Sequence, residues 1–113
     1  MKISHTWLIA LLFLSSSLAS AHEMTDLDKK AISRSCYEKF IFAAKIMAYR
    51  QDGITRKDLM DSLSTQGVVL NDHLNTIVAD AYTHNVHVDK EEKQLASERY
   101  GYMQRRLCFM SYY

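Results

Sequence analysis

The chain has 113 residues, with 14 lysines and arginines against 13 aspartates and glutamates, two cysteines, three glycines and no proline. This length suffices for one domain and is too short for two, and the near-zero net charge argues against a nucleic-acid-binding protein. The 48% of hydrophobic residues excludes a disordered chain, and the absence of proline favours an all-helical one.

Residues 1–21 are predicted to be a secretory signal peptide. Lys2 supplies the positive charge, an apolar run follows from Trp7 to Leu14, and Ala19-Ser20-Ala21 forms a cleavage site of small residues. The run is far shorter than the ~20 residues that span a bilayer. Cleavage after Ala21 would leave one domain over residues 22–113, and cleavage after Ala19 would leave two more residues at its start. The mature protein is expected to be periplasmic or secreted and without a membrane span.

Two helices are predicted in the first half of the mature chain. The first runs from about Asp26 to Gln51, with Thr25 as its N-cap and Gly53 as its left-handed stop. Its hydrophobic stripe comprises Cys36, Phe40, Ala43, Ala44 and Met47. The second helix begins after a capping box of Thr55 and Asp58, with Ile54 and Leu59 as a hydrophobic staple, and it ends before Gly67.

Two more helices are predicted in the second half, after the short apolar link 68–70. The third runs from about Asp72 to His84, with Asn71 as its N-cap. Its amphipathic stripe comprises Leu74, Ile77, Val78, Ala81 and Tyr82. The fourth begins after Asp89 and runs to about Met110, and its stripe comprises Ala96, Tyr100, Met103, Leu107 and Met110.

The two cysteines, Cys36 and Cys108, are predicted to form one disulfide, because export places them in an oxidising compartment. Such a bond joins the first half of the first helix to the end of the fourth. The two long helices would then run antiparallel, with the two shorter ones packed across them. The predicted fold is an all-α, compact four-helix domain with one disulfide between the first and last helices.

A group of histidines and aspartates around the third helix is the candidate metal site: Asp80, His84, His87 and Asp89. Imidazole and carboxylate groups are common ligands of zinc and copper. Alternatively, His84 interacts with the dipole at the C-terminal end of the third helix, and Asp89 caps the fourth. The spacing of the four residues matches no specific metal-binding motif. A second metal option places copper on a mature N-terminal His22, with His73 as a further ligand.

No catalytic residue and no cofactor are predicted. The sequence contains no nucleophile elbow, no H-E-x-x-H and no glycine-rich phosphate loop. The Asp80–His84 pair lacks a nucleophile placed by any motif, and bridged cysteines cannot supply one. These features favour a protein that is not an enzyme.

Tyrosine and methionine side chains crowd the C-terminal helix, and both residue types are enriched at protein interfaces. We expect some of them to be exposed, because apolar residues occur on more than one face of this helix. The alternative is that Tyr100, Met103 and Met110 belong to the core. The predicted contact residues are Tyr100, Tyr102, Arg105, Arg106, Tyr112 and Tyr113.

The segment 43–53 follows the pattern A-x-x-I-M-x-x-R-Q-x-G and lies between an early and a late cysteine. With the signal peptide and the Thr55 helix start, this arrangement resembles small exported proteins of proteobacteria and phages, mostly of unassigned function. The resemblance implies a fold and no site residue. In size, compartment and composition the chain is also similar to the periplasmic immunity proteins that neutralise type VI secretion amidase effectors.

The leading hypothesis is an exported, non-enzymatic helical protein that binds a protein partner in the periplasm, as an immunity or inhibitor factor does. Self-association into a homodimer is an alternative use of the same surface. Two other hypotheses are a periplasmic metal-binding protein and a stress chaperone that exposes apolar surface on acidification.

Overall fold

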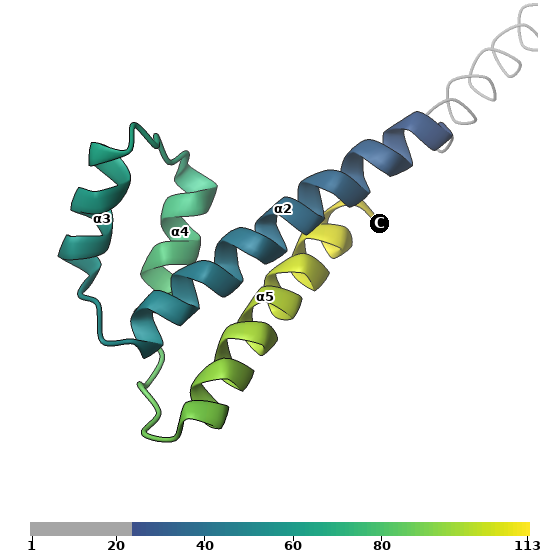
Figure 1. Ribbon diagram of the computed structural model, residues 1–113. Helices are drawn as coiled ribbons and strands as arrows, with labels where there is room; N and C mark the ends of the chain where they lie inside the picture. Colours follow the sequence, from purple (N-terminus) through teal and green to yellow (C-terminus); the bar gives the residue numbers. More distant parts are fainter. Residues whose placement is uncertain (1–23) are drawn as a thin grey trace, which may run out of the picture. The chain divides into compact units, whose positions relative to one another are not determined.

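A computed structural model describes residues 24–113, so the predicted signal peptide and His22 lie outside the described part (Figure 1). The chain divides into two compact units, residues 1–31 and 32–113. The core, the disulfide and the predicted metal and contact residues all belong to the second unit.

Four α-helices make up this part of the chain: α2 (Asp26–Gln51), α3 (Arg56–Thr65), α4 (Asp72–Ala81) and α5 (Lys90–Tyr112). No strand occurs within residues 24–113, and the prediction of an all-α domain is confirmed. The long helices α2 and α5 lie side by side and antiparallel, with α3 and α4 packed to one side of them (Figure 1). None of the described helices combines the length and hydropathy that crossing a membrane requires.

The helix starts are formed by the predicted caps. Thr25 and Asp28 bond reciprocally: the amide of Asp28 donates to Thr25 Oγ1 (3.1 Å) and the amide of Thr25 donates to Asp28 Oδ2 (3.3 Å). Thr55, Asn71 and Asp89 likewise accept from first-turn amides of α3, α4 and α5. Gly53 and Gly67 have positive φ angles of 83° and 75°, which end α2 and α3 as predicted.

Helix α4 ends at Ala81, three residues earlier than predicted. The amides of Thr83 and His84 donate to the carbonyls three residues before them, at 3.0 and 3.2 Å, so the chain tightens and leaves the helix. Arg50 of α2 then holds this turn, because its Nε donates to the carbonyl of His84 (3.2 Å). The early stop therefore depends on a contact from another helix.

All four helices contribute to one hydrophobic core. The hydroxyl of Tyr82, at the end of α4, donates to the carbonyl of Ile54 before α3 (2.8 Å) and closes one side of it. The eight buried residues of the core are Ala43, Ile46, Met47, Leu59, Ile77, Val78, Ala81 and Tyr100. The hydrophobic staple predicted for the second helix and the stripe predicted for the third lie in this core or against it.

The buried face of α5 differs from the predicted stripe. Tyr100, Gly101, Gln104 and Cys108 are buried, whereas three residues of the predicted stripe are well exposed. These are Met103 at 40%, Leu107 at 52% and Met110 at 63% exposure. The prediction is wrong here because the disulfide and the close approach at Gly101 turn a different side of α5 toward α2.

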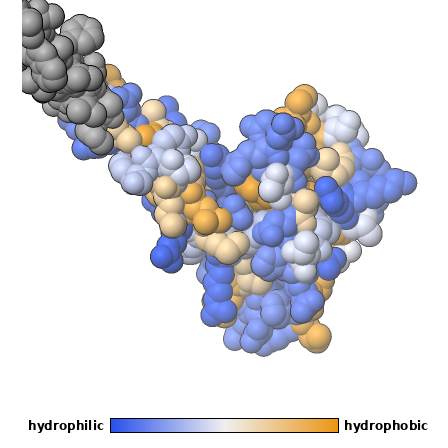
Figure 2. Space-filling model, turned by 180° about the vertical axis from the view of Figure 1, so that it is seen from behind, coloured by the Kyte–Doolittle hydropathy of each residue, from blue (hydrophilic) through white to orange (hydrophobic). Residues whose placement is uncertain are grey.

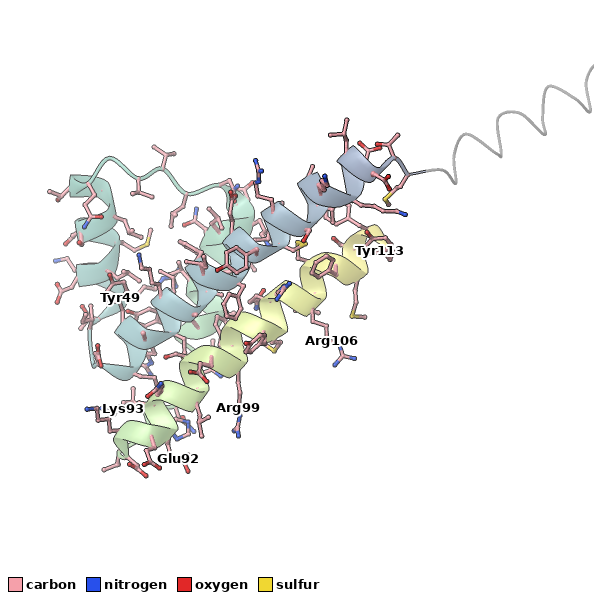
Figure 3. All side chains as sticks on the ribbon, turned by 45° about the vertical axis from the view of Figure 1, so that its right-hand side comes forward. Tyr49, Glu92, Lys93, Arg99, Arg106 and Tyr113 are labelled. Carbon is pink, nitrogen blue, oxygen red and sulfur yellow. A yellow bond between two sulfur atoms is a disulfide. The ribbon has the colours of Figure 1, made fainter. Side chains whose placement is uncertain are left out.

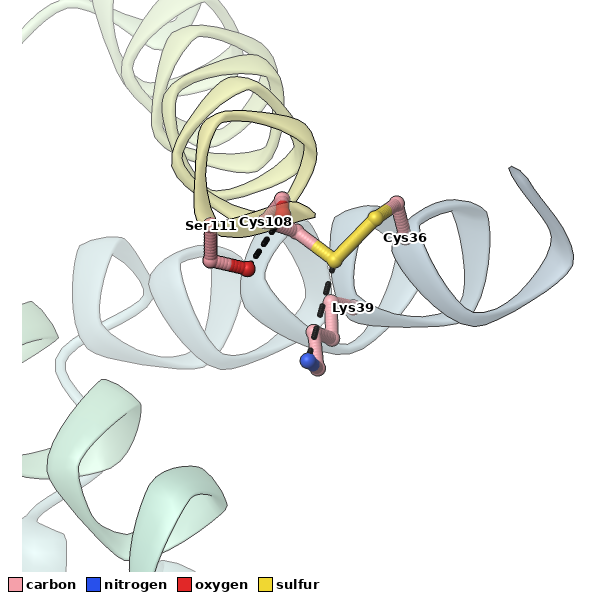
Figure 4. The surroundings of a disulfide bond; sticks show 4 residues. All are labelled: Cys36, Lys39, Cys108 and Ser111. Atoms are coloured by element: carbon pink, nitrogen blue, oxygen red, sulfur yellow. Dashed lines mark hydrogen bonds between the residues drawn. A yellow bond between two sulfur atoms is a disulfide. The ribbon is translucent and has the colours of Figure 1, made fainter. Parts of the chain in front are cut away.

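The disulfide between Cys36 and Cys108 forms as predicted, with the two Cα atoms 5.5 Å apart (Figure 4). Both cysteines are buried. Lys39 places its Nζ 3.7 Å from the sulfur of Cys108, and the hydroxyl of Ser111 donates to the Cys108 carbonyl. The bond thus joins the early part of α2 to the last turns of α5.

At the other end of α2, Gln51 ties the helix to the segment that precedes α5. Its side chain is 1% exposed. Its Nε2 donates to the carbonyl of Asn85 (2.8 Å), and its Oε1 accepts from the amide of His87 (2.9 Å). Two backbone groups of an irregular segment are satisfied by one buried side chain.

Replacing Gln51 with leucine is expected to lower the free energy of unfolding by about 2 kcal/mol, because two backbone groups near the core lose their partner. Urea denaturation measures the loss. Gln94→Leu is the control, since Gln94 is an exposed glutamine of α5 whose amide reaches only Glu98. Equal stability of the two variants would contradict a stabilising role for Gln51.

Candidate functional site

The structure separates the four residues of the predicted metal site. Nε2 of His84 lies 3.7 Å from Oδ2 of Asp80, while Nδ1 of His87 lies 3.7 Å from Oε2 of Glu92. Asp89 accepts the amide of Glu91 as the cap of α5. Across residues 24–113, no group of three or more histidine, cysteine, aspartate or glutamate side chains is placed to hold a metal ion.

The two histidines nevertheless border the same small hollow, of about 220 Å³, beside α5. Arg99 and Met103 of α5 also line it. The structure therefore brings together His84 and Asp80 as a pair, and His84 and His87 around one hollow. A metal site built from these residues stays a prediction.

Tyr100 is a core residue that connects α5 to α4. It is 3% exposed, and its hydroxyl lies 2.8 Å from the carbonyl of Ile77 and 3.0 Å from Oδ2 of Asp80. The ring of His84 meets the Tyr100 ring edge-on, with the ring centres 5.2 Å apart. Burial, and next the hydrogen bond to Asp80, raise the pKa of Tyr100. The prediction that Tyr100 contacts a partner is wrong, because its side chain is not on the surface.

The raised pKa of Tyr100 makes stability depend on pH in the alkaline range. The neutral phenol is favoured in the folded state over the unfolded chain, where the pKa is 10.0. The contribution of Tyr100 is therefore complete below about pH 10 and is lost as the pH rises further. Burial raises the pKa of Tyr82 as well, which adds a loss of the same sign.

We expect Tyr100→Phe to lower stability by about 1 kcal/mol at neutral pH and to flatten the alkaline loss. Urea denaturation at about pH 8 and about pH 11 measures both effects. Tyr113→Phe is the control, because Tyr113 is exposed at the C-cap of the same helix. An alkaline loss that is equally steep in Tyr100→Phe and wild type would contradict this prediction.

The other predicted contact residues lie at or near the surface. Tyr102, Tyr112 and Tyr113 are exposed, and so is Arg106. Arg105 is half-buried, with its guanidinium over the ring of Phe109 at 5.6 Å from the ring centre. Tyr102 is anchored on α2, since its ring centre is 4.8 Å from that of Phe40. The exposed ring of Tyr102 is therefore held against α2.

One side of α5 presents hydrophobic side chains to solvent. We call it the outer face of α5, and its hydrophobic members are Tyr102, Met103, Leu107, Met110 and Tyr113, all exposed. Figure 2 shows hydrophobic side chains gathered over the C-terminal half of this helix. The solvent side of a helix is ordinarily polar, so the outer face of α5 is a candidate contact surface.

Two arginines complete the outer face of α5. Arg99 and Arg106 are exposed, and they point away from the other helices from the same side of α5 (Figure 3). Along the helix they alternate with methionines in the order Arg99, Met103, Arg106, Met110, at spacings of four, three and four residues. This spacing keeps all four on one line of the helix.

A groove of about 460 Å³ borders the outer face on the side of α4. Met103 and Leu107 of α5 line it on one side, and the buried Ile77 and the carboxylate of Asp80 line it from α4. Lys39 of α2 also belongs to the lining. The groove is hollowed beside hydrophobic side chains, so it offers a place for a side chain from outside.

Met103, Leu107 and Met110 are the candidate functional residues that the predicted stripe assigned to the core. The position of Cys108 carries the signal that corrects this assignment. Cys108 must face Cys36, and residues 101 and 104 share its side of the helix. Once that side faces α2, the two methionines point outward.

Comparisons with known proteins find no matching family model, no matching curated protein and no matching solved structure. The function therefore has to be inferred from the residues of the chain and their surroundings.

Proposed function

We propose that this chain is an exported, non-enzymatic helical protein that binds another protein through the outer face of α5, in the manner of an immunity or inhibitor factor. The observation that carries the proposal is the row of exposed hydrophobic side chains on one side of α5, with two arginines among them. Aromatic residues, methionine and arginine are the types enriched in protein interfaces. Large exposed hydrophobic patches on single chains commonly mark binding sites.

The scaffold behind this surface supports the same proposal. Cys108, Gly101 and Tyr100 hold the opposite side of α5 against α2 and α4 through a covalent bond, a close contact and a hydrogen bond. A rigid helix loses little conformational entropy on binding, so more of the contact energy becomes affinity. An inhibitor acts by occupying its target, and a preformed surface suits that task.

Capture of a partner from periplasmic extract tests the proposal. The tagged protein is compared with Met103→Asp/Met110→Asp, which places two carboxylates on the outer face of α5. The control is Val69→Asp/Val88→Asp, since both valines are more than 90% exposed and lie outside α5. We expect wild type and the control to retain the same protein. The amount of that protein retained by the methionine variant should be lower by a factor of at least about ten.

Circular dichroism and urea denaturation show whether the variants remain folded, so that lost binding reports on the surface. Failure of wild type to retain any specific protein would count against the proposal. Equal retention by all three proteins would place the binding surface elsewhere.

Metal binding is the alternative function, and the approach of His84 to Asp80 is the observation that favours it. Metal analysis of the purified protein, and zinc titration of wild type against His84→Ala/His87→Ala, distinguish the two. Stoichiometric zinc or copper that is lost in the histidine variant would support the metal site. Its absence at stoichiometric levels would remove this alternative.

A further inference from the structure

Resting on the proposed function, we infer that the outer face of α5 docks an acidic amphipathic helix of the partner protein. Two carboxylates of that helix pair with Arg99 and Arg106, and its hydrophobic side chains pack on Met103 and Met110. One larger hydrophobic side chain enters the groove between α4 and α5.

The charge of this region selects an acidic partner. From Arg99 to Tyr113 the sequence contains three arginines and no aspartate or glutamate. Among residues 24–113, neither Arg99 nor Arg106 has a carboxylate within ion-pair distance. The groove itself is lined by one cation, Lys39, and one carboxylate, Asp80, so the positive charge is concentrated on the outer face of α5. Carboxylates that approach Arg99 and Arg106 from outside would therefore meet positive charge without an ion-pair partner, which favours the encounter with the partner and the orientation of its helix.

The spacing of the outer face selects a helix as the docking element. Arg99 and Arg106 are seven residues apart, or about 10.5 Å along the axis, which is two helical turns. The alternation of arginine and methionine at spacings of four and three residues is the repeat with which helices pack side by side. A partner helix with carboxylates one heptad apart and hydrophobic residues between them matches this line.

The methionines and the groove explain how such a helix would be held. Methionine side chains are flexible and polarisable, so they adapt to the surface that they meet. Beside them, the groove of about 460 Å³ is walled by Met103 and Leu107 and is large enough for an aromatic or leucine side chain. Large side chains buried in such pockets supply most of the energy of a typical interface.

A second copy of this chain fits the same face less well. Two copies that pack through the C-terminal half of α5 bring cationic segments together, because no acidic residue follows Glu98. A lipid surface also fits less well, because the groove interrupts the hydrophobic face and polar side chains, His73 and Thr76, line it on the α4 side. The observations thus favour an acidic helix of another protein.

Site-specific photocrosslinking in cells that export the full chain tests the inference. A photoreactive amino acid replaces Met103 in the test variant and Val69 in the control. Val69 is 91% exposed and lies in the link between α3 and α4. We expect an adduct at Met103 and none at Val69. The crosslinked peptide should be helical in its own protein, with two carboxylates one heptad apart and hydrophobic residues between them.

Charge reversal then tests the pairing with the identified partner. Arg99→Glu/Arg106→Glu should weaken binding at least tenfold, and replacing the two partner carboxylates with lysine should restore it. The control is Arg34→Glu/Lys45→Glu, which changes the net charge equally at exposed positions of α2. We expect this control to weaken binding by less than threefold.

Other outcomes overturn the inference and separate it from the proposed function. A specific adduct at Val69 and none at Met103 would leave partner binding in place and overturn docking on α5. A crosslinked peptide without carboxylates, or binding unaffected by charge reversal, would overturn the acidic partner.

An adduct with a second copy, supported by a dimer in sedimentation equilibrium, would overturn a different protein as the occupant. If wild type co-sediments with vesicles of neutral and anionic phospholipid and Arg99→Glu/Arg106→Glu does not, the occupant of the outer face is a membrane and the inference of a partner helix is overturned. Absence of any adduct, together with failure of the capture experiment, would overturn the inference and the proposed function alike.

Discussion

Replacing Cys36 and Cys108 together with serine is expected to lower the free energy of unfolding by about 4 kcal/mol. The two cysteines are 72 positions apart, so the bond removes much of the conformational freedom of the unfolded chain. The loss is large against the roughly 5–15 kcal/mol that stabilises a typical domain. Urea denaturation of the double variant and of wild type measures it.

Wild type treated with a reductant serves as the control for the disulfide. Reduced wild type should lose nearly as much stability as the serine variant, because both lack the covalent bond. Reduced wild type keeps the sulfur atoms, so the comparison separates the loss of the bond from the loss of the sulfur atoms. An unfolding midpoint that does not move on reduction would contradict the prediction. We also expect the outer face of α5 to bind its partner less tightly without the bond, since the last turns of α5 would fray.

Replacing Gly101 with valine is expected to lower the free energy of unfolding by about 3 kcal/mol. A Cβ atom at this position would lie 3.0 Å from both Cδ2 and the carbonyl oxygen of Phe40, and 3.1 Å from the Cβ of Ala44. The carbonyl belongs to the backbone of α2 and cannot rotate away. The two long helices would have to separate, which loosens the core around Tyr100.

Gly101→Ala gives a second measure of the same contact. Alanine favours a helix over glycine by about 1 kcal/mol, so an unhindered site would become more stable. We expect the variant to be less stable than wild type, because the contacts of the new Cβ outweigh that gain. Gln94→Val, at an exposed position of α5, is the control for helix propensity. A stabilised Gly101→Ala would show that the helices separate at little cost.

Most helix boundaries of this protein follow from local interactions, and local interactions are readable in a sequence. The amides of Asp58 and Leu74 donate to side chains only three residues before them, at 3.1 and 2.8 Å. Gly53 ends α2 through its own positive φ angle. The end of α4 was not predictable in this way, because Arg50 and Tyr82 form its contacts with distant segments.

The candidate binding surface, the outer face of α5, depends on contacts between distant parts of the chain. Hydrophobic residues occur around most of the circumference of the last helix, so periodicity alone does not decide which of them face the core. The predicted stripe therefore includes Met103 and Met110 beside Tyr100, which is also a predicted contact residue. In the structure Tyr100 is buried and the two methionines are exposed, and Arg105 lies over Phe109 instead of pointing into solvent.

Gln51 illustrates what a helical pattern does not reveal. In the sequence it is the last residue of a helix, where a glutamine is commonly solvated. In the structure it is buried and binds the backbone of Asn85 and His87, more than 30 positions away. Such a partner can be found only when the chain is folded, because nothing near Gln51 in the sequence indicates it.

By itself, the sequence determined the helical class, the caps and the single pairing that two cysteines allow, because each depends on residue type and short spacing. Only the tertiary structure decided the rotation of α5. That rotation is set by contacts between α2 and α5, the Cys36–Cys108 bond and the approach of Gly101 to Phe40, which join residues more than 60 positions apart. They turn one side of α5 inward and leave Arg99, Met103, Arg106 and Met110 outward, as the surface on which the proposed function rests.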